Sequence, residues 1–142
     1  MKAFSLIETM LVILILSIIF AIFTPKISTF FDFGVKNQLK VEYALINSAI
    51  KNQEFQANLL QNSFNLTKFD SAKIDTKNEE LFKYILENPF KSTTTKDKEV
   101  GKWAKMASSD YIFFTKNSSV KFSLKNNSFE CISPEEICKE LE

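Results

Sequence analysis

The chain contains no histidine and no arginine, and these two absences exclude several classes of function. Without histidine there is no imidazole general base, no Ser–His or Cys–His nucleophile pair and no histidine metal ligand. All 18 basic residues are lysines, which lack the planar fork that arginine uses to bind phosphates and bases. A net charge of +1 over 142 residues likewise gives no reason to expect bulk binding of nucleic acid.

Glycine and cysteine are scarce, with two residues of each. The two glycines, Gly34 and Gly101, cannot build a glycine-rich phosphate loop or a dinucleotide-binding turn. Two cysteines cannot complete a structural zinc site by themselves. The acidic residues Asp97, Glu99 and Asp110 do not have the spacing of a calcium loop. We therefore expect no metal site and no cofactor, and no set of side chains indicates an enzyme.

One long apolar block dominates the N-terminal part of the chain. Between Phe4 and Thr24, 16 of 21 residues are hydrophobic, and Glu8 is the one charged residue among them. A helix needs roughly 20 apolar residues to cross a bilayer, and this helix would be apolar on every side. We therefore predict a transmembrane helix over residues 4–24.

Two simpler readings of this block fit less well. A secretory signal peptide would have a basic leader and a small-x-small cleavage site. Here Lys2 is the only basic residue before the apolar run, and no A-x-A site follows that run. A plain uncleaved anchor accounts for the length but leaves Glu8 unexplained. A carboxylate buried in a membrane costs about 2.5 kcal/mol or more, so such residues usually have a partner.

The stretch KAFSLIE, from Lys2 to Glu8, resembles the cleavage and methylation motif of type IV prepilins and type II secretion pseudopilins. In that family a short basic leader ends in glycine just before a phenylalanine, and here Ala3 stands in the place of the glycine. Phe4 matches the new N-terminus and Glu8 matches the family glutamate. Pro25 matches a helix-kinking proline that commonly follows the apolar run.

The resemblance implies a processing and assembly route. A prepilin peptidase and methylase would cut between Ala3 and Phe4, which makes residues 1–3 the leader, and would methylate the amine of Phe4. Glu8 would then pair with the N-terminal amine of a neighbouring subunit and set the register of assembly. The mature chain would be a single-pass protein of the bacterial inner membrane with its head in the periplasm.

The same resemblance implies a function. The chain would be a minor pilin or pseudopilin that joins other pilin-like subunits on an inner-membrane assembly platform. The resulting periplasmic filament would serve type II secretion or DNA uptake in natural transformation. The alternative from another functional class is a membrane-anchored periplasmic binding module that does not polymerise.

The remainder of the chain is predicted to continue the helix and then form a head. Residues 25–60 are expected to be the amphipathic second half of the helix, because apolar residues recur three, four or seven positions apart. The members of this stripe are Val35, Leu39, Tyr43, Ile46, Ile50, Ala57 and Leu60. The fold class is therefore α+β and pilin-like, with a transmembrane first half of a long N-terminal helix and a small antiparallel β-sheet head.

Residues 61–142 are expected to form that head. A capping box from Thr76 to Glu79 predicts a short helix before Pro89. The polar stretch 91–109 is predicted to be a loop, and alternating apolar residues predict strands over 111–114, 120–124 and 129–132. Ser133 and Pro134 have the residue types of a helix start, which predicts a short C-terminal helix.

The two cysteines lie on either side of that helix start. Cys131 precedes it and Cys138 lies within it, so a disulfide in an oxidising compartment would close a short loop. The alternative is two reduced thiols. Many pilins carry a C-terminal disulfide, so the resemblance favours the bridge.

A lysine-rich stretch with one tryptophan is the remaining candidate site, and its members are Lys96, Lys98, Lys102, Trp103 and Lys105. Lysines beside an aromatic ring could bind single-stranded DNA by phosphate contact and stacking. The same residues could contact a neighbouring subunit. The simpler interpretation is a solvated loop.

Overall fold

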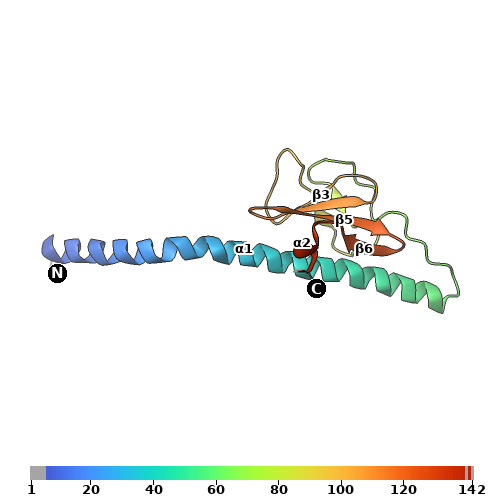
Figure 1. The fold of residues 1–142 in the computed structure, drawn as a ribbon, viewed down its shortest axis with the longest axis horizontal. Coiled ribbons are helices and arrows are strands. Elements are labelled where there is room, and N and C mark those ends of the chain that lie inside the picture. The colour runs from blue at the N-terminus through green and yellow to red at the C-terminus, as the bar shows by residue number, and fades with distance from the viewer. Residues whose placement is uncertain (1–5, 140, 142) are drawn as a thin grey trace. The chain divides into compact units, whose positions relative to one another are not determined.

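The computed structural model describes residues 6–139 and residue 141, and within the first helix it describes side chains for residues 6–21 and 33–59. The described chain has an α+β fold (Figure 1). Its elements are α1 (Leu6–Leu59), β1 (Glu80–Leu81), β2 (Phe90–Lys91), β3 (Trp103–Lys105), β4 (Asp110–Phe114), β5 (Ser119–Lys125), β6 (Ser128–Cys131) and α2 (Glu135–Lys139). The chain divides between Gly34 and Val35 into two compact units, an N-terminal unit and a head unit, which we describe separately.

The N-terminal unit is the first half of α1, whose bounds agree with the helix expected over residues 4–60. The leucines and isoleucines that follow Leu6 favour an uninterrupted helix, and the segment lacks glycine until Gly34. Pro25 lies inside α1, where the backbone is helical on both sides of it. Within the part of the chain that the structure describes, no helix has an apolar stretch long enough to cross a membrane.

In the head unit, the second half of α1 presents one apolar stripe to the core. Leu39, Ile46 and Ile50 are buried, and Val35 and Tyr43 pack against them, as the helical spacing predicts. Leu60 was expected to belong to the stripe, and this is wrong, because the helix ends at Leu59 and Leu60 is 71% exposed.

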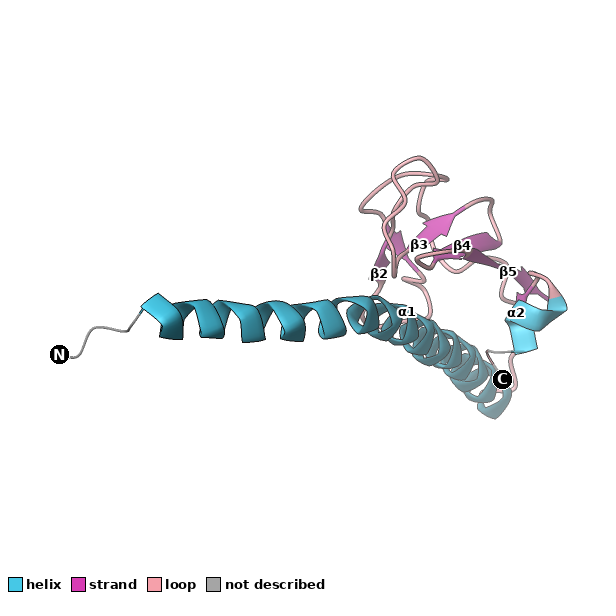
Figure 2. Cartoon of the chain, turned by 60° about the vertical axis from the view of Figure 1, so that its left-hand side comes forward, coloured by secondary structure: helices cyan, strands magenta, loops and turns pink. Residues whose placement is uncertain are grey.

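The strands of the head form an antiparallel meander in the order β3-β4-β5-β6, and β1 and β2 form a separate short ladder. Figure 2 shows the strands on one side of the second half of α1. The predicted strands over 111–114, 120–124 and 129–132 correspond to β4, β5 and β6. Asn126 and Asn127 join β5 to β6 with φ angles of 49° and 61°, the left-handed values that a two-residue hairpin turn requires and asparagine tolerates.

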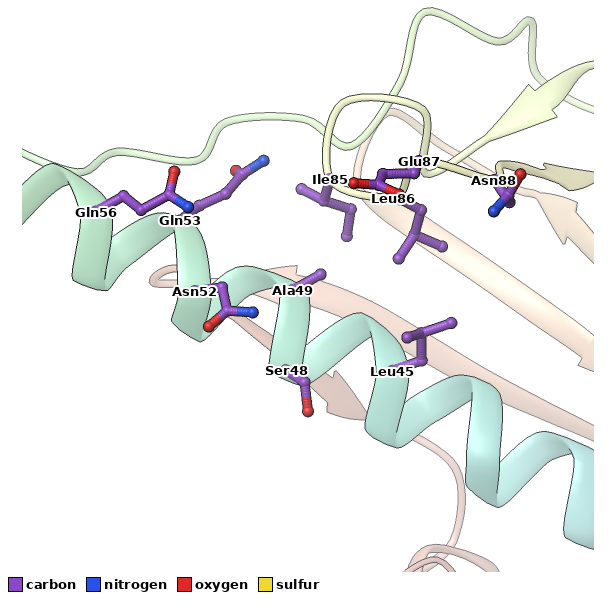
Figure 3. A pocket seen from close by; sticks show the side chains of 10 residues that line it. All are labelled: Leu45, Ser48, Ala49, Asn52, Gln53, Gln56, Ile85, Leu86, Glu87 and Asn88. Atoms are coloured by element: carbon purple, nitrogen blue, oxygen red, sulfur yellow. The ribbon is translucent and has the colours of Figure 1, made fainter.

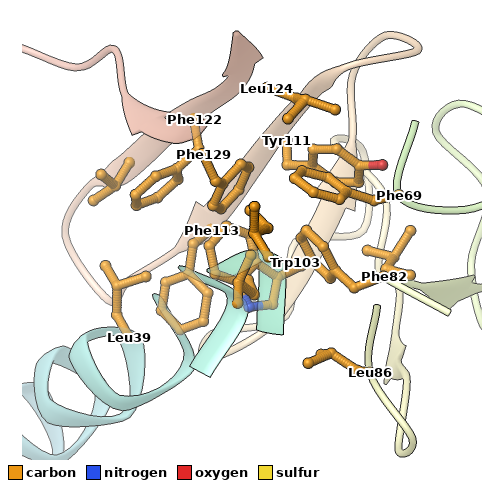
Figure 4. Close-up of a cluster of buried hydrophobic side chains, with 14 of the residues drawn as sticks. Leu39, Phe69, Phe82, Leu86, Trp103, Tyr111, Phe113, Phe122, Leu124 and Phe129 are labelled. Atoms are coloured by element: carbon orange, nitrogen blue, oxygen red, sulfur yellow. The ribbon is translucent and has the colours of Figure 1, made fainter. Parts of the chain in front are cut away.

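The core between α1 and the sheet is largely aromatic. The rings of Trp103, Tyr111, Phe113, Phe122 and Phe129 point from the sheet into this core (Figure 4). They meet Phe69 and Phe82, which come from the segment between α1 and the sheet. Tyr43 of α1 adds contacts with the rings of Phe122 and Phe129. Aromatic pairs in such contact contribute about 0.5–1.5 kcal/mol each beyond the area they bury, so these pairs stabilise the packing of the sheet against the helix and the connecting segment.

Two sequence predictions for residues 76–109 are wrong. The helix expected after Thr76 does not form, because Asn78 and Phe82 have φ angles of 63° and 61°, which no α-helix accommodates. Instead of capping a helix, the Thr76 hydroxyl donates to the Ile74 carbonyl, and the Glu79 amide donates to the Ser92 hydroxyl. The loop expected over residues 91–109 contains β3, which pairs with β4.

Candidate functional site

The helical segment from Leu6 to Ala21 is the first candidate site, because its apolar side chains are exposed on all sides. Twelve of its sixteen residues are large hydrophobic residues that are 44–76% exposed. A patch of this extent on a folded protein normally marks contact with another protein or with lipid.

The polar residues of this segment fall into two groups. The hydroxyls of Thr9 and Ser17 donate to the carbonyls of Leu6 and Ile13, one turn back along the helix, so their polar atoms are satisfied locally. The Glu8 side chain is exposed, and its carboxylate makes no hydrogen bond or ion pair with any described residue. The segment therefore carries a single carboxylate whose partner must come from elsewhere.

The other residues of the processing motif cannot be placed in the same way. Ala3 and Phe4, the predicted cleavage and methylation positions, lie outside the described residues. The bend expected at Pro25 stays a prediction, since the structure describes only its helical backbone.

The cysteine prediction is confirmed. Cys131 and Cys138 form a disulfide, with their Cα atoms 5.7 Å apart. The bridge ties α2 to the end of β6. The Ser133 hydroxyl, expected to cap α2, instead accepts a hydrogen bond from the Lys121 amide at 2.8 Å, which fixes the same connection to β5.

The lysine-rich stretch does not form one exposed surface. Trp103 is 1% exposed, and its indole Nε1 donates to Glu42 Oε2 on α1 at 2.6 Å. Lys105 is 5% exposed and its ammonium lies 2.6 Å from Asp70 Oδ1. The expectation that these two residues contact DNA or another subunit is therefore wrong, because strand alternation in β3 turns both side chains into the core.

The other three lysines of the stretch are at the surface. Lys96 and Lys98 are exposed, and the Lys98 ammonium lies 5.8 Å from the centre of the Phe114 ring. Lys102 binds Glu99, with 2.5 Å between the ammonium and Oε2. Hydrogen bonds from Lys102, and then from Lys77, lower the pKa of Glu99 to about 2. The acidic residues of this loop are thus paired with lysines.

A buried polar network was missed by the sequence reasoning. The Asp70 side chain is fully buried and accepts from the Lys105 ammonium, the Tyr111 hydroxyl at 2.8 Å and the amides of Ala72 and Phe82. Burial, together with the charge of Asp70, raises the pKa of Tyr111 well above its ordinary value. The alternation Trp103-Ala104-Lys105 places Lys105 on the same face as a tryptophan, which was the one available signal.

A second polar connection joins α1 to the sheet. Glu42 accepts from Trp103 and from Gln38, whose Nε2 also donates to the Gly101 carbonyl at 2.9 Å. Burial raises the pKa of Glu42 above its ordinary value, and these hydrogen bonds oppose the rise. Gly101 has a φ of 80°, a backbone conformation that disfavours any residue with a side chain. A Cβ at this position would also lie only 3.0 Å from Gln38 Oε1.

An open groove of about 480 Å³ lies on the head unit between α1 and the segment Ile85–Asn88 (Figure 3). Its lining consists of Leu45, Ser48, Ala49, Asn52, Gln53, Gln56, Ile85, Leu86, Glu87 and Asn88. Gln53 Nε2 donates to the Tyr84 carbonyl at 2.7 Å and so holds the two walls together. No sequence motif pointed to this groove.

Comparison of the chain with known proteins found no matching family model, no similar curated protein and no similar solved structure.

Proposed function

We propose that the chain is a pilin-like subunit, a minor pilin or pseudopilin, of a periplasmic filament that is based on the inner membrane. The filament would serve type II secretion or DNA uptake in natural transformation. The observation that carries the proposal is the helix Leu6–Ala21, which exposes apolar side chains on all sides and bears one unpartnered carboxylate, Glu8. The motif Ala3–Phe4 before this helix supports it, as does an α+β head with a C-terminal disulfide.

The chemistry of Glu8 is understandable in an assembly of such helices. In an apolar environment an isolated carboxylate and an isolated amine each cost several kcal/mol, and pairing them offsets much of that cost. Cleavage before Phe4 would create an amine four residues before Glu8 in the sequence. A pair between Glu8 of one subunit and the amine of the next would therefore also fix how far neighbouring helices are shifted.

The alternative is a membrane-anchored binding module that does not polymerise. It would use the same apolar helix as an anchor, and the disulfide-containing head would be the binding part. In that case Phe4 need not become the N-terminus and Glu8 has no required partner.

Intact-mass measurement of the chain purified from bacterial membranes distinguishes the two. Loss of Met1, Lys2 and Ala3 together with gain of one methyl group supports the pilin-like subunit. A mass that retains Met1 favours the anchored module.

A variant pair tests assembly itself. We expect Glu8→Ala to remain in the membrane fraction but to lose co-purification with partner pilin-like subunits. Glu54→Ala, which removes an exposed carboxylate from the second half of α1, should co-purify normally. Equal co-purification of both variants would contradict the proposal. Deletion strains should then be assayed for DNA uptake and for exoprotein release to identify the machine.

A further inference from the structure

The groove between α1 and Ile85–Asn88 has the size and composition of a binding site rather than of a packing defect. Its volume of about 480 Å³ lies within the range of ligand sites in proteins. Leu45 and Ala49 provide the apolar part of the lining on α1, and Leu86 provides it on the turn. Figure 3 shows Ala49, Gln53 and Gln56 directed from the helix toward the turn.

Most of the polar lining consists of side-chain amides, and three of these four amides have no hydrogen-bond partner among the described residues. The side-chain amides of Asn52 and Gln56 on α1 and of Asn88 on the turn make no hydrogen bond to any described residue. Each side-chain amide offers both a donor and an acceptor, which is the combination that a peptide backbone presents. A ligand with alternating N–H and C=O groups would therefore satisfy them in pairs.

The repeat along the helix fits such a ligand. Asn52 and Gln56 are four residues apart, which is about 6 Å along α1. Alternate residues of an extended peptide are about 6.6 Å apart, which is close to the spacing of Asn52 and Gln56 along α1. From Leu45 to Gln56 the groove follows about 16 Å of helix, which accommodates about five extended residues.

The charge of the groove lining and its lack of aromatic residues limit the class of ligand. Glu87 is the one charged residue in the lining, so an acidic ligand is disfavoured and a basic side chain beside Glu87 is favoured. No aromatic residue lines the groove, so a sugar would lack a ring on which to stack. We propose that this groove binds an extended segment of another protein, about five residues long, neutral apart from a basic side chain that faces Glu87.

This binding does not depend on polymerisation, because every residue that carries it lies in the head unit. The test uses the full-length chain in detergent micelles, labelled with ¹⁵N. The probes are a positional library of end-capped pentapeptides and, as the competing ligand class, a neutral pentasaccharide. The readout is the chemical shift of the side-chain amides of Asn52, Gln53 and Gln56.

Two matched variants locate the site. Ala49→Trp fills the groove and should abolish the peptide-induced shifts, whereas Ala44→Trp adds the same ring to an exposed position outside the lining and should preserve them. Glu87→Lys should reverse the preference for basic over acidic peptides. The change per charged side chain should be about two- to fivefold in Kd, as for an exposed ion pair.

The peptide titrations have outcomes that either support or overturn the proposal. Peptide-induced shifts in the wild type and Ala44→Trp but not in Ala49→Trp support the proposal. Three results would overturn it: no shift with millimolar peptide, equal shifts in Ala49→Trp, or shifts with the pentasaccharide alone. None of these results bears on whether Phe4 is processed or Glu8 is needed for assembly, so the proposed function is tested independently.

Discussion

Replacement of Asp70 by alanine removes the carboxylate on which four donors of the head core converge. Its side chain is fully buried, and the Lys105 side chain beside it is 6% exposed. Removing one partner of a buried ion pair costs about 3–5 kcal/mol, because the other charge is left without compensation. The Tyr111 hydroxyl and the amides of Ala72 and Phe82 also lose their acceptor.

We therefore expect Asp70→Ala to lower the free energy of unfolding of the head by about 4 kcal/mol or more. Lys105→Met should cost less, about 2–3 kcal/mol, because Asp70 keeps three of its donors. The double variant should cost less than the sum of the single variants by about 1–3 kcal/mol, since it no longer contains an unpaired buried charge.

The assay is urea unfolding of the full chain in detergent, followed by fluorescence. Trp103 is the single tryptophan of the chain and is 1% exposed, so its emission reports on the head core. Asp97→Ala is the control, because it removes an exposed pair with Lys77 and should cost at most about 1 kcal/mol. If Asp70→Ala costs no more than this control, the reasoning about the buried network is refuted.

Three further predictions use the same titration. Cys138→Ser should cost about 2.5 kcal/mol, the loop-closure value for residues 131–138, and a reductant should destabilise the wild type equally. A fully stable reduced protein would contradict this. Asn127→Gly should cost about 2 kcal/mol, because the side chain holds the Leu66 amide and the Phe64 carbonyl, whereas Asn126→Gly should change stability by less than about 0.5 kcal/mol. Glu42→Gln should stabilise the head at neutral pH but not in acid. Burial raises the pKa of Glu42 above its ordinary value of 4.5, so the stability of the wild type falls as the pH rises from 4.5 through the raised pKa. In Glu42→Gln the side-chain amide oxygen can still accept the hydrogen bond from Trp103. If the free energies of unfolding of the wild type and Glu42→Gln, plotted against pH, do not converge in acid, this prediction is contradicted.

The parts of the fold that were predictable are those governed by local periodicity. The spacing of Leu39, Ile46 and Ile50 predicts a helix with one buried face, and this face is the one that packs. The alternation in β5 predicts a strand because the signal lies within a few residues, and this strand pairs with β6. The disulfide was predicted from the expected oxidising compartment and from the resemblance to pilins, with two reduced thiols as the alternative, and the structure contains the bridge.

The parts that failed depend on contacts between distant residues. Phe82 leaves the helical conformation because its amide binds Asp70, twelve positions earlier, and its ring enters the aromatic core. Strand β3 is three residues long and lies in a polar stretch, so its pairing with β4 decides its structure. In the candidate site, Lys105 looked like a surface lysine because its partner is 35 residues away in the sequence.

The strand order of the head has a consequence for how rapidly the molecule can reach its structure. In the β3-β4-β5-β6 meander each strand pairs with its neighbour along the chain, and such local pairing is associated with faster folding than long-range pairing. The helical stripe of α1 and the residues Phe69 and Asp70 precede the sheet in the sequence. During synthesis each strand after β3 therefore emerges when the helix on which it packs and the strand with which it pairs have already been synthesised. The head can grow one hairpin at a time, and the last cysteine arrives when its partner on β6 is already held in the sheet.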